Sequence, residues 1–223
     1  SEDGSPDIRT CESLLTKKLK PDLFIAVDYF GRKINFEETS NFVRSLQGWL
    51  IEDAAHILLP KNTVGVHAHF VLFSPHKFLP IPDGAMLVIK RNNFLREQSI
   101  DWQAFENQYE RIINKPKKFD VTPYYWLMKR CLQKLGFRKK AAKKIKFDEE
   151  ELVMSTLKFI HPKISGLARK LLFFLLDKLD EELIKRNKGY LFWKKLLRKE
   201  NLEGEEIFPK YNNVSPYLFG INF

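Results

Sequence analysis

Two histidines that lie two residues apart are the first side chains in the sequence that could carry out chemistry. His67 and His69 fall in an apolar stretch, residues 63–73, whose alternation is typical of a β-strand. Side chains two positions apart on a strand project from the same face, so both imidazoles could bind one divalent metal ion. Asp28, in the apolar stretch of residues 23–30, is a candidate third ligand. The alternative interpretation is a pair of surface histidines that binds nothing.

The triplet His67-Ala68-His69 resembles the paired-histidine motif of the HUH single-strand endonucleases. The resemblance covers this triplet and the position of a later tyrosine. It implies that a metal ion on the histidines polarises a scissile phosphate, which a tyrosine on a later helix attacks. Tyr124 and Tyr125, at the start of a later predicted helix, are the matching residues. The resemblance therefore implies a metal-dependent nuclease as an alternative function, with Tyr124 or Tyr125 as the nucleophile.

A basic segment near the middle of the chain is the second candidate site. Residues 111–146 contain thirteen Lys and Arg and one acid, a formal charge of +12, whereas the whole chain carries +10. Lys and Arg bind phosphate backbones through Coulomb attraction and counterion release, and neighbouring aromatic rings can stack on unpaired bases. The pattern predicts these nucleic-acid-binding residues: Lys115, Lys117, Lys118, Lys129, Arg130, Lys134, Arg138, Lys139, Lys140, Lys143, Lys144, Lys146, Tyr124, Tyr125 and Trp126.

The basic segment favours a nucleic-acid-associated, non-enzymatic component of a larger intracellular assembly, without a cofactor or a small-molecule substrate. The nucleic acid would be single-stranded or structured. The C-terminal helices would contact protein partners, and a membrane surface is a further candidate partner. Two alternatives stay open beside this function: the metal-dependent nuclease, and a structural subunit that docks on an acidic protein or a membrane.

Cysteine usage indicates the compartment. The two cysteines, Cys11 and Cys131, lie far apart and belong to no paired motif. We therefore expect a reducing, intracellular environment. No apolar run approaches the ~20 residues that span a bilayer, so we expect a soluble or peripherally attached protein.

The elements that must position these residues are predicted from periodicity. Apolar runs predict strands at residues 23–30, 63–73 and 85–90, and the nearly continuous apolar run of the last predicts a central strand. Between the first two, a helix capped by Asn35 is expected to run to about Leu58. The later helices are predicted to begin at Asp101, at Thr122, which is followed by Pro123, at Asp148 and at Ser165, with stops at Gly136 and Gly189.

The order of these elements predicts an α+β fold. A small sheet of about three strands in residues 23–91, with its helices, would precede a mostly α-helical C-terminal part. The change of composition near residue 147 suggests an α+β part at residues 1–146, which ends in the basic helix and arm, and a helical part at residues 147–223. One continuous domain is equally compatible with the sequence.

Overall fold

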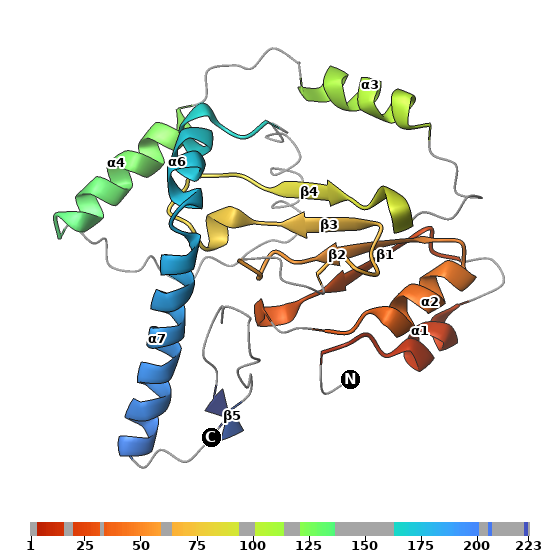
Figure 1. Cartoon of the computed structure of the whole chain (residues 1–223), viewed down its shortest axis with the longest axis horizontal. Helices are drawn as coiled ribbons and strands as arrows, with labels where there is room; N and C mark the ends of the chain where they lie inside the picture. The colour runs from red at the N-terminus through yellow and green to blue at the C-terminus, as the bar shows by residue number, and fades with distance from the viewer. Residues whose placement is uncertain are drawn as a thin grey trace, which may run out of the picture. The chain divides into compact units, whose positions relative to one another are not determined.

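The computed structural model describes most of the chain as helices, strands and their connections (Figure 1). The described residues are 4–15, 20–31, 34–58, 64–93, 101–113, 121–136, 163–200, 205–206 and 221–222. The chain forms two compact units. The sheet unit comprises Ser1–Pro80, Ala85–Ser99 and Leu172–Phe223, and the helical unit comprises Ile81–Gly84 and Ile100–Leu171. The boundary predicted between residues 146 and 147 lies outside the described residues and stays a prediction.

A four-stranded sheet organises the sheet unit. Its strands, in spatial order, are β1 (Leu23–Val27), β2 (Trp49–Asp53), β3 (Phe70–Phe73) and β4 (Met86–Ile89). The first three are parallel, with Val27 paired to Asp53 and Asp53 paired to Leu72, whereas β4 runs antiparallel to β3. The carboxyl ends of β1, β2 and β3 therefore meet at one edge of the sheet. The predicted α+β class is confirmed, with one strand more in this sheet than the three expected.

The missing strand is β2, because the predicted helix from Asn35 to about Leu58 is wrong in its second half. Helix α2 (Glu37–Ser45) begins as expected, where the Asn35 side chain accepts a hydrogen bond from the Glu37 amide at 3.0 Å. It ends in a Schellman motif: Gln47 has a φ of 55°, and the Gly48 amide donates to the Val43 carbonyl. The left-handed position carries Gln instead of Gly, so the sequence gives no clear stop signal there.

The strands β3 and β4 also differ from expectation. Residues 64–69 form turns and bends, and β3 covers only the last four residues of the predicted strand. Phe70, Val71 and Phe73 are all buried, as in a strand that is covered on both faces. β4 was predicted to be central, but it lies at the edge of this sheet with Met86 and Leu87 exposed.

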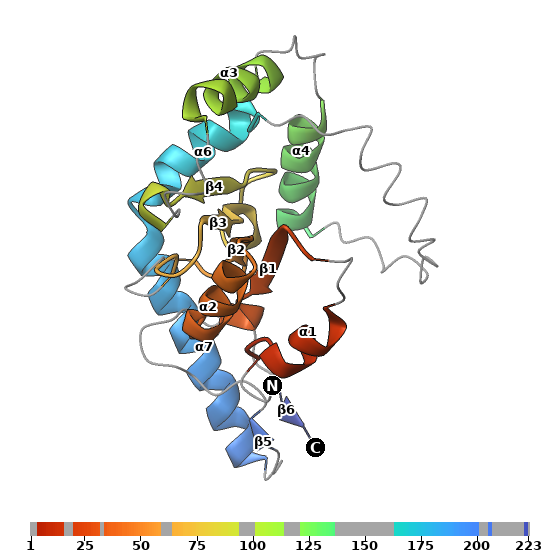
Figure 2. The same ribbon diagram turned by 90° about the vertical axis from the view of Figure 1, so that its right-hand side faces the viewer.

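The core of the sheet unit lies between the sheet and α2. Ala26, Leu50 and Val71, from three adjacent strands, pack in one cluster with Phe42 and Val43 of α2. Helix α1 (Ile8–Leu14) contacts α2 and adds Ile8 to the same cluster, and both helices lie on this side of the sheet in Figures 1 and 2. This face of the sheet is therefore closed by α2 and α1.

The described helices of the second half are α3 (Trp102–Ile113), α4 (Thr122–Lys134), α6 (Gly166–Leu176) and α7 (Leu179–Lys199). Three of them, α3, α4 and α6, begin near the predicted residues, whereas the start of α7 at Leu179 was not predicted. Asp101 and Ser165 cap α3 and α6 through their side chains, and Gly136, with a φ of 90°, follows α4. Gly189 was predicted to end a helix but lies inside α7, because one glycine costs a long helix only about 1 kcal/mol. The helix predicted from Asp148 lies outside the described residues.

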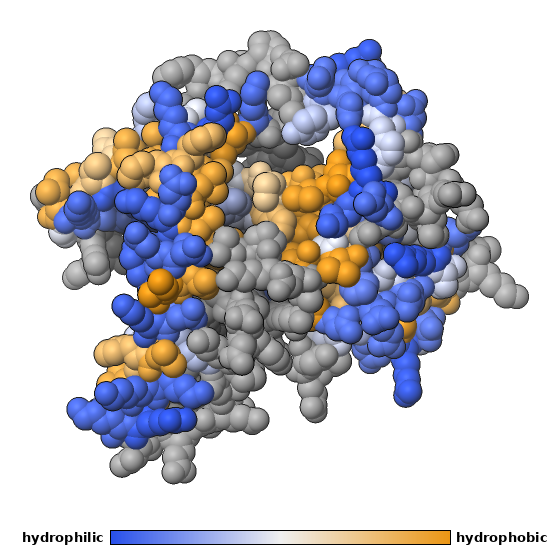
Figure 3. Space-filling model, in the orientation of Figure 1, coloured by the Kyte–Doolittle hydropathy of each residue, from blue (hydrophilic) through white to orange (hydrophobic). Residues whose placement is uncertain are grey.

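Short elements complete the described chain. They are the 3₁₀ turns η1 (Tyr29–Gly31), η2 (Pro75–Lys77) and η3 (Arg91–Asn93), and the paired strands β5 (Glu205–Glu206) and β6 (Ile221–Asn222). Figure 3 shows apolar patches between polar ones along α7, where Ile184, Leu191, Phe192 and Trp193 are exposed. Among the described helices, none is long and apolar enough to cross a membrane.

Candidate functional site

The edge of the sheet where β1, β2 and β3 end carries a set of polar side chains. Ligands of open α/β sheets bind outside the carboxyl ends of the parallel strands. β2 ends at Asp53 and is followed by His56, and β3 is followed by Ser74 and the turn η2, which carries Lys77. All of them belong to the sheet unit. We therefore take Asp53, His56 and Lys77 as the candidate functional site.

The carboxylate of Asp53 is positioned by the turn that directly follows it. Its carboxylate oxygen Oδ1 accepts a hydrogen bond from the Ala55 amide at 3.0 Å, and its carbonyl accepts one from the Asp28 amide at 3.0 Å. The side chain is half-buried, while Ala54 and Ala55 behind it are buried. The carboxylate is thus a negative charge in a fixed position at the end of an inner strand.

His56 interacts electrostatically with the other two residues of the site, Asp53 and Lys77. Burial lowers the pKa of His56, the charge of Lys77 lowers it further, and the charge of Asp53 acts in the opposite direction. Because these interactions fall off with distance, the imidazole lies close enough to sense both groups. A lowered pKa keeps the imidazole neutral near pH 7, so it can accept a proton.

Lys77 is exposed, but the backbone that carries it is well ordered. The Lys77 amide donates to the Ser74 carbonyl at 3.0 Å, and the amides of Phe78 and Leu79 donate to the Pro75 carbonyl at 3.0 and 2.8 Å. Ser74, Phe78 and Leu79 are buried on either side of the turn. The turn therefore presents one primary amine at the sheet edge, where an amine can act as a nucleophile toward a carbonyl carbon.

A second polar pair lies on the α2 side of the sheet. Asp28 and Glu52 are 2% and 3% exposed, and their carboxyl groups hydrogen-bond to each other. Burial raises the pKa of Asp28 to about 9, with further contributions from the charge and the hydrogen bond of Glu52. Burial also raises the pKa of Glu52, although the Gly65 amide donates to its Oε2 at 2.8 Å. Asp28 therefore keeps its proton at neutral pH and donates it to Glu52.

The structure does not bring His67, His69 and Asp28 together as metal ligands. His69 is buried, and its Nδ1 accepts a hydrogen bond from the Leu50 amide at 2.9 Å, which uses a lone pair that a metal ion would need. His67 lies in a bend before β3 instead of on a strand face shared with His69. Nowhere in the described parts of the chain do three His, Cys, Asp or Glu side chains come together as a metal-binding group.

The predicted nucleic-acid-binding residues are only partly described. On α4, Tyr124 and Tyr125 are exposed and Trp126 is half-buried, with the Arg130 guanidinium 5.4 Å from its ring centroid. Lys129, Arg130 and Lys134 are exposed on the same helix. The other predicted residues lie outside the described part of the chain: Lys115, Lys117, Lys118, Arg138, Lys139, Lys140, Lys143, Lys144 and Lys146.

Sequence reasoning missed the residues of the candidate site. Asp53 and His56 were assigned to a helix and Lys77 to a proline-rich connection, so their common position at one sheet edge was hidden. The usable signal was that each lies within five residues of the end of a short apolar run: Asp53 and His56 after WLI, and Lys77 after FVLF. Such runs are typical of buried parallel strands.

Comparison with known proteins defines the fold. No family model matches the sequence, and no curated protein matches it either. Among solved structures, the fold is similar over 99% of the chain to PseC of Helicobacter pylori, an aminotransferase involved in the biosynthesis of pseudoaminic acid, with a TM-score of 0.58 and 18% identity. It is also similar over 97% of the chain to a DegT DnrJ EryC1 StrS aminotransferase from Brucella abortus, with a TM-score of 0.57 and 13% identity. The chain matches 50% and 49% of the lengths of these two proteins.

This finding corrects the predicted function. The prediction of a non-enzymatic nucleic-acid-binding scaffold is wrong, together with its nucleic-acid partner and the expected lack of a small-molecule substrate, because nearly the whole chain shares its fold with two aminotransferases. The physical reason for the error is that charge clustering in a sequence reports only where charges are close along the chain. Many solvated surfaces carry such charges, and clustering does not identify the ligand.

Proposed function

We propose that this chain carries residues that bind pyridoxal phosphate in an enzyme that transfers amino groups to or from small molecules. The observation that supports the proposal most is the combination of one amine, one carboxylate and one imidazole at the carboxyl edge of a parallel sheet. This edge occurs in a fold that two aminotransferases share. Because the chain spans about half of their lengths, the activity of the whole enzyme is part of the proposal.

The chemistry of the three side chains fits this cofactor. Pyridoxal phosphate sites use a lysine amine for the aldehyde group and an acidic residue beside the pyridinium nitrogen. Lys77 supplies an exposed amine on an ordered turn, and Asp53 supplies a fixed carboxylate on the adjacent strand. When it is bound, the cofactor acts as an electron sink that stabilises a carbanion of the substrate.

Each side chain has a role that follows from its surroundings. Lys77 would hold the aldehyde end of the cofactor and exchange protons through its Nζ atom. Asp53 would keep the ring nitrogen protonated by placing a negative charge beside it. His56, whose pKa is lowered by burial and by Lys77, would offer a neutral imidazole against the ring or accept a proton.

A titration with pyridoxal phosphate tests the proposal. We expect the wild-type chain to give a saturable visible absorbance change, Lys77→Arg to lose it, and Asp53→Asn to weaken binding by about tenfold through the loss of a charge pair. The matched controls are Lys90→Arg and Asp22→Asn, since Lys90, after β4, and Asp22, before β1, both lie at the opposite edge of the sheet. The absence of a saturable change in the wild type at about millimolar cofactor would contradict the proposal.

An intracellular location is part of the proposal. Cys11 and Cys131 are both free thiols in the structure, as expected for a reducing compartment.

A further inference from the structure

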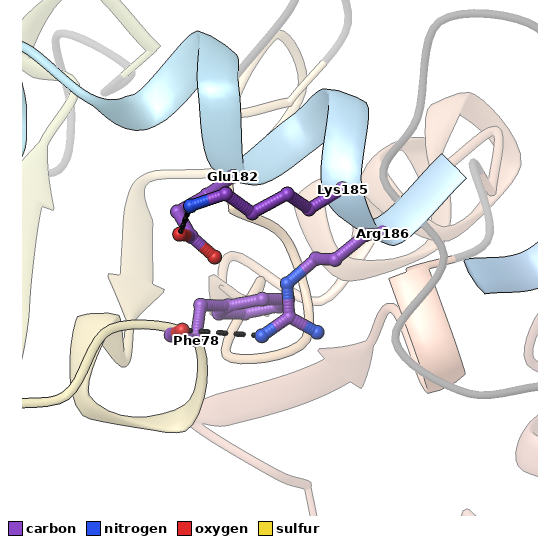
Figure 4. Close-up of polar contacts among 4 residues, drawn as sticks. All are labelled: Phe78, Glu182, Lys185 and Arg186. Carbon is purple, nitrogen blue, oxygen red and sulfur yellow. Dashed lines mark hydrogen bonds and ion pairs between the residues drawn. The ribbon is translucent and has the colours of Figure 1, made fainter. Parts of the chain in front are cut away.

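Arg186 of α7 contacts the residue that directly follows Lys77. Its Nη2 donates a hydrogen bond to the Phe78 carbonyl at 3.1 Å, and its guanidinium carbon lies 4.8 Å from the centroid of the Phe78 ring. Figure 4 shows the guanidinium group at the ring and the carbonyl of the same residue. One side chain of a distant helix therefore binds both the backbone and the ring of Phe78, within the sheet unit.

Phe78 ends the turn that presents Lys77. Its amide donates to the Pro75 carbonyl, and its ring is buried with 6% exposure. The Lys77 side chain is exposed, so few packing contacts restrict it. The backbone of residues 74–79 therefore sets the point from which this side chain extends, and Arg186 contacts this segment from outside it.

We propose that Arg186 is a positioning residue, which holds the η2 turn so that the amine of Lys77 stays at the carboxyl edge of the sheet. The proposal rests on the proposed function for its consequence, the binding of pyridoxal phosphate by Lys77. Its structural part, that Arg186 stabilises the turn, can be tested without any cofactor. A planar guanidinium can stack on a ring and donate from its edge at once, whereas an ammonium group is a point charge. This geometry explains why arginine is suited to the position.

Lys185 provides a matched control one residue away. Its ammonium group pairs with Glu182 at 2.7 Å, on a side chain that is 63% exposed, and Figure 4 shows this pair beside the Arg186 contact. Lys185→Met removes one positive charge from the same turn of α7 without touching Phe78. Arg186→Met removes the same charge and also the contact. The difference between the two variants therefore isolates the contact from the charge.

Hydrogen exchange of the cofactor-free protein tests the structural part. In Arg186→Met we expect the amides of Lys77, Phe78 and Leu79 to exchange about tenfold faster, as for the loss of one charge-assisted hydrogen bond, while the amides of β1 and β2 keep their rates. Lys185→Met should match the wild type, and Arg186→Lys should lie between. Unchanged exchange in Arg186→Met, or equal acceleration throughout the sheet, would overturn the proposal. If Arg186→Met does not fold, Arg186→Lys decides by the same two criteria.

Trapping of the cofactor tests the consequence. After incubation with pyridoxal phosphate and reduction with borohydride, we expect the labelled fraction at Lys77 to fall by roughly three- to tenfold in Arg186→Met and to stay unchanged in Lys185→Met. Labelling at Lys77 that is equal in all variants, despite faster exchange, would overturn the positioning role. No labelling of Lys77 in the wild type would instead remove the proposed function, while the exchange result would still report on the Arg186 contact.

Discussion

At the scale of single residues, the acidic side chains near the carboxyl ends of the strands fall into two groups that differ in their burial. Asp53 lies at the open edge of the sheet, where its carboxylate can meet a ligand. Asp28 and Glu52 lie under α2, where they share one proton. Adjacent residues of one strand, Glu52 and Asp53, thus have different environments because their side chains project from opposite faces.

The buried pair predicts a pH-dependent stability. The pKa of Asp28 is raised from 3.8 to about 9 in the folded chain, so the folded state binds more protons than the unfolded state between these values. Its contribution to the free energy of unfolding is therefore complete below about pH 4 and is lost as the pH rises toward about 9, by at most about 1.4 kcal/mol per pH unit for one proton. Urea denaturation from about pH 5 to about pH 9 measures this slope.

Asp28→Asn is the variant that tests the origin of the slope. An amide can donate to Glu52 without a titrating proton, so we expect a flatter pH profile and a higher stability than the wild type near pH 8. Asp22→Asn, at an exposed position before β1, serves as the control. Parallel profiles for the wild type and Asp28→Asn would show that the pair does not share a proton in this way.

At the scale of elements, we expect alanine to have opposite effects on the free energy of unfolding at two glycines, Gly65 and Gly189. Gly65 has a φ of 76°, and a Cβ there would lie 2.7 Å from the Cγ2 of buried Val71, so Gly65→Ala should lower the free energy of unfolding by about 1–3 kcal/mol. Gly189 lies inside α7, where a Cβ would meet no neighbouring atom within 4 Å, so Gly189→Ala should raise it by about 0.5–1 kcal/mol. Chemical denaturation of both variants measures the change in the free energy of unfolding. Changes of the same sign in the two variants would contradict these predictions.

Elements also show how far the sequence determines the fold. The starts of α2, α3 and α6 were predicted from Asn35, Asp101 and Ser165, whose side chains accept local hydrogen bonds from nearby backbone amides. β2 was not predicted, since WLIED has apolar residues that fit either a helix or a strand, and only pairing with β1 and β3 decides between them. Helix starts that depend on neighbouring residues can be predicted from the sequence, whereas strand pairing depends on residues far along the chain.

At the scale of the whole molecule, the candidate site exists only because of sheet topology. Asp53 and Lys77 are separated by a strand and its connections, and the parallel order of β2 and β3 brings their ends to one edge. From the sequence, the basic segment was the strongest signal, and it led to the wrong function. A site that is assembled from strand ends leaves no compact motif, so its residues could not be recognised without the sheet.

The measurement that tests the account most directly is peptide mapping of the protein after incubation with pyridoxal phosphate and reduction with borohydride. Every lysine can react slowly, so the informative quantity is the distribution of the label among them. The account predicts a label concentrated on Lys77 and strongly reduced by Asp53→Asn, because the carboxylate and the amine form one site. A label spread over the exposed lysines, with Lys77 no more reactive than Lys185, would contradict it.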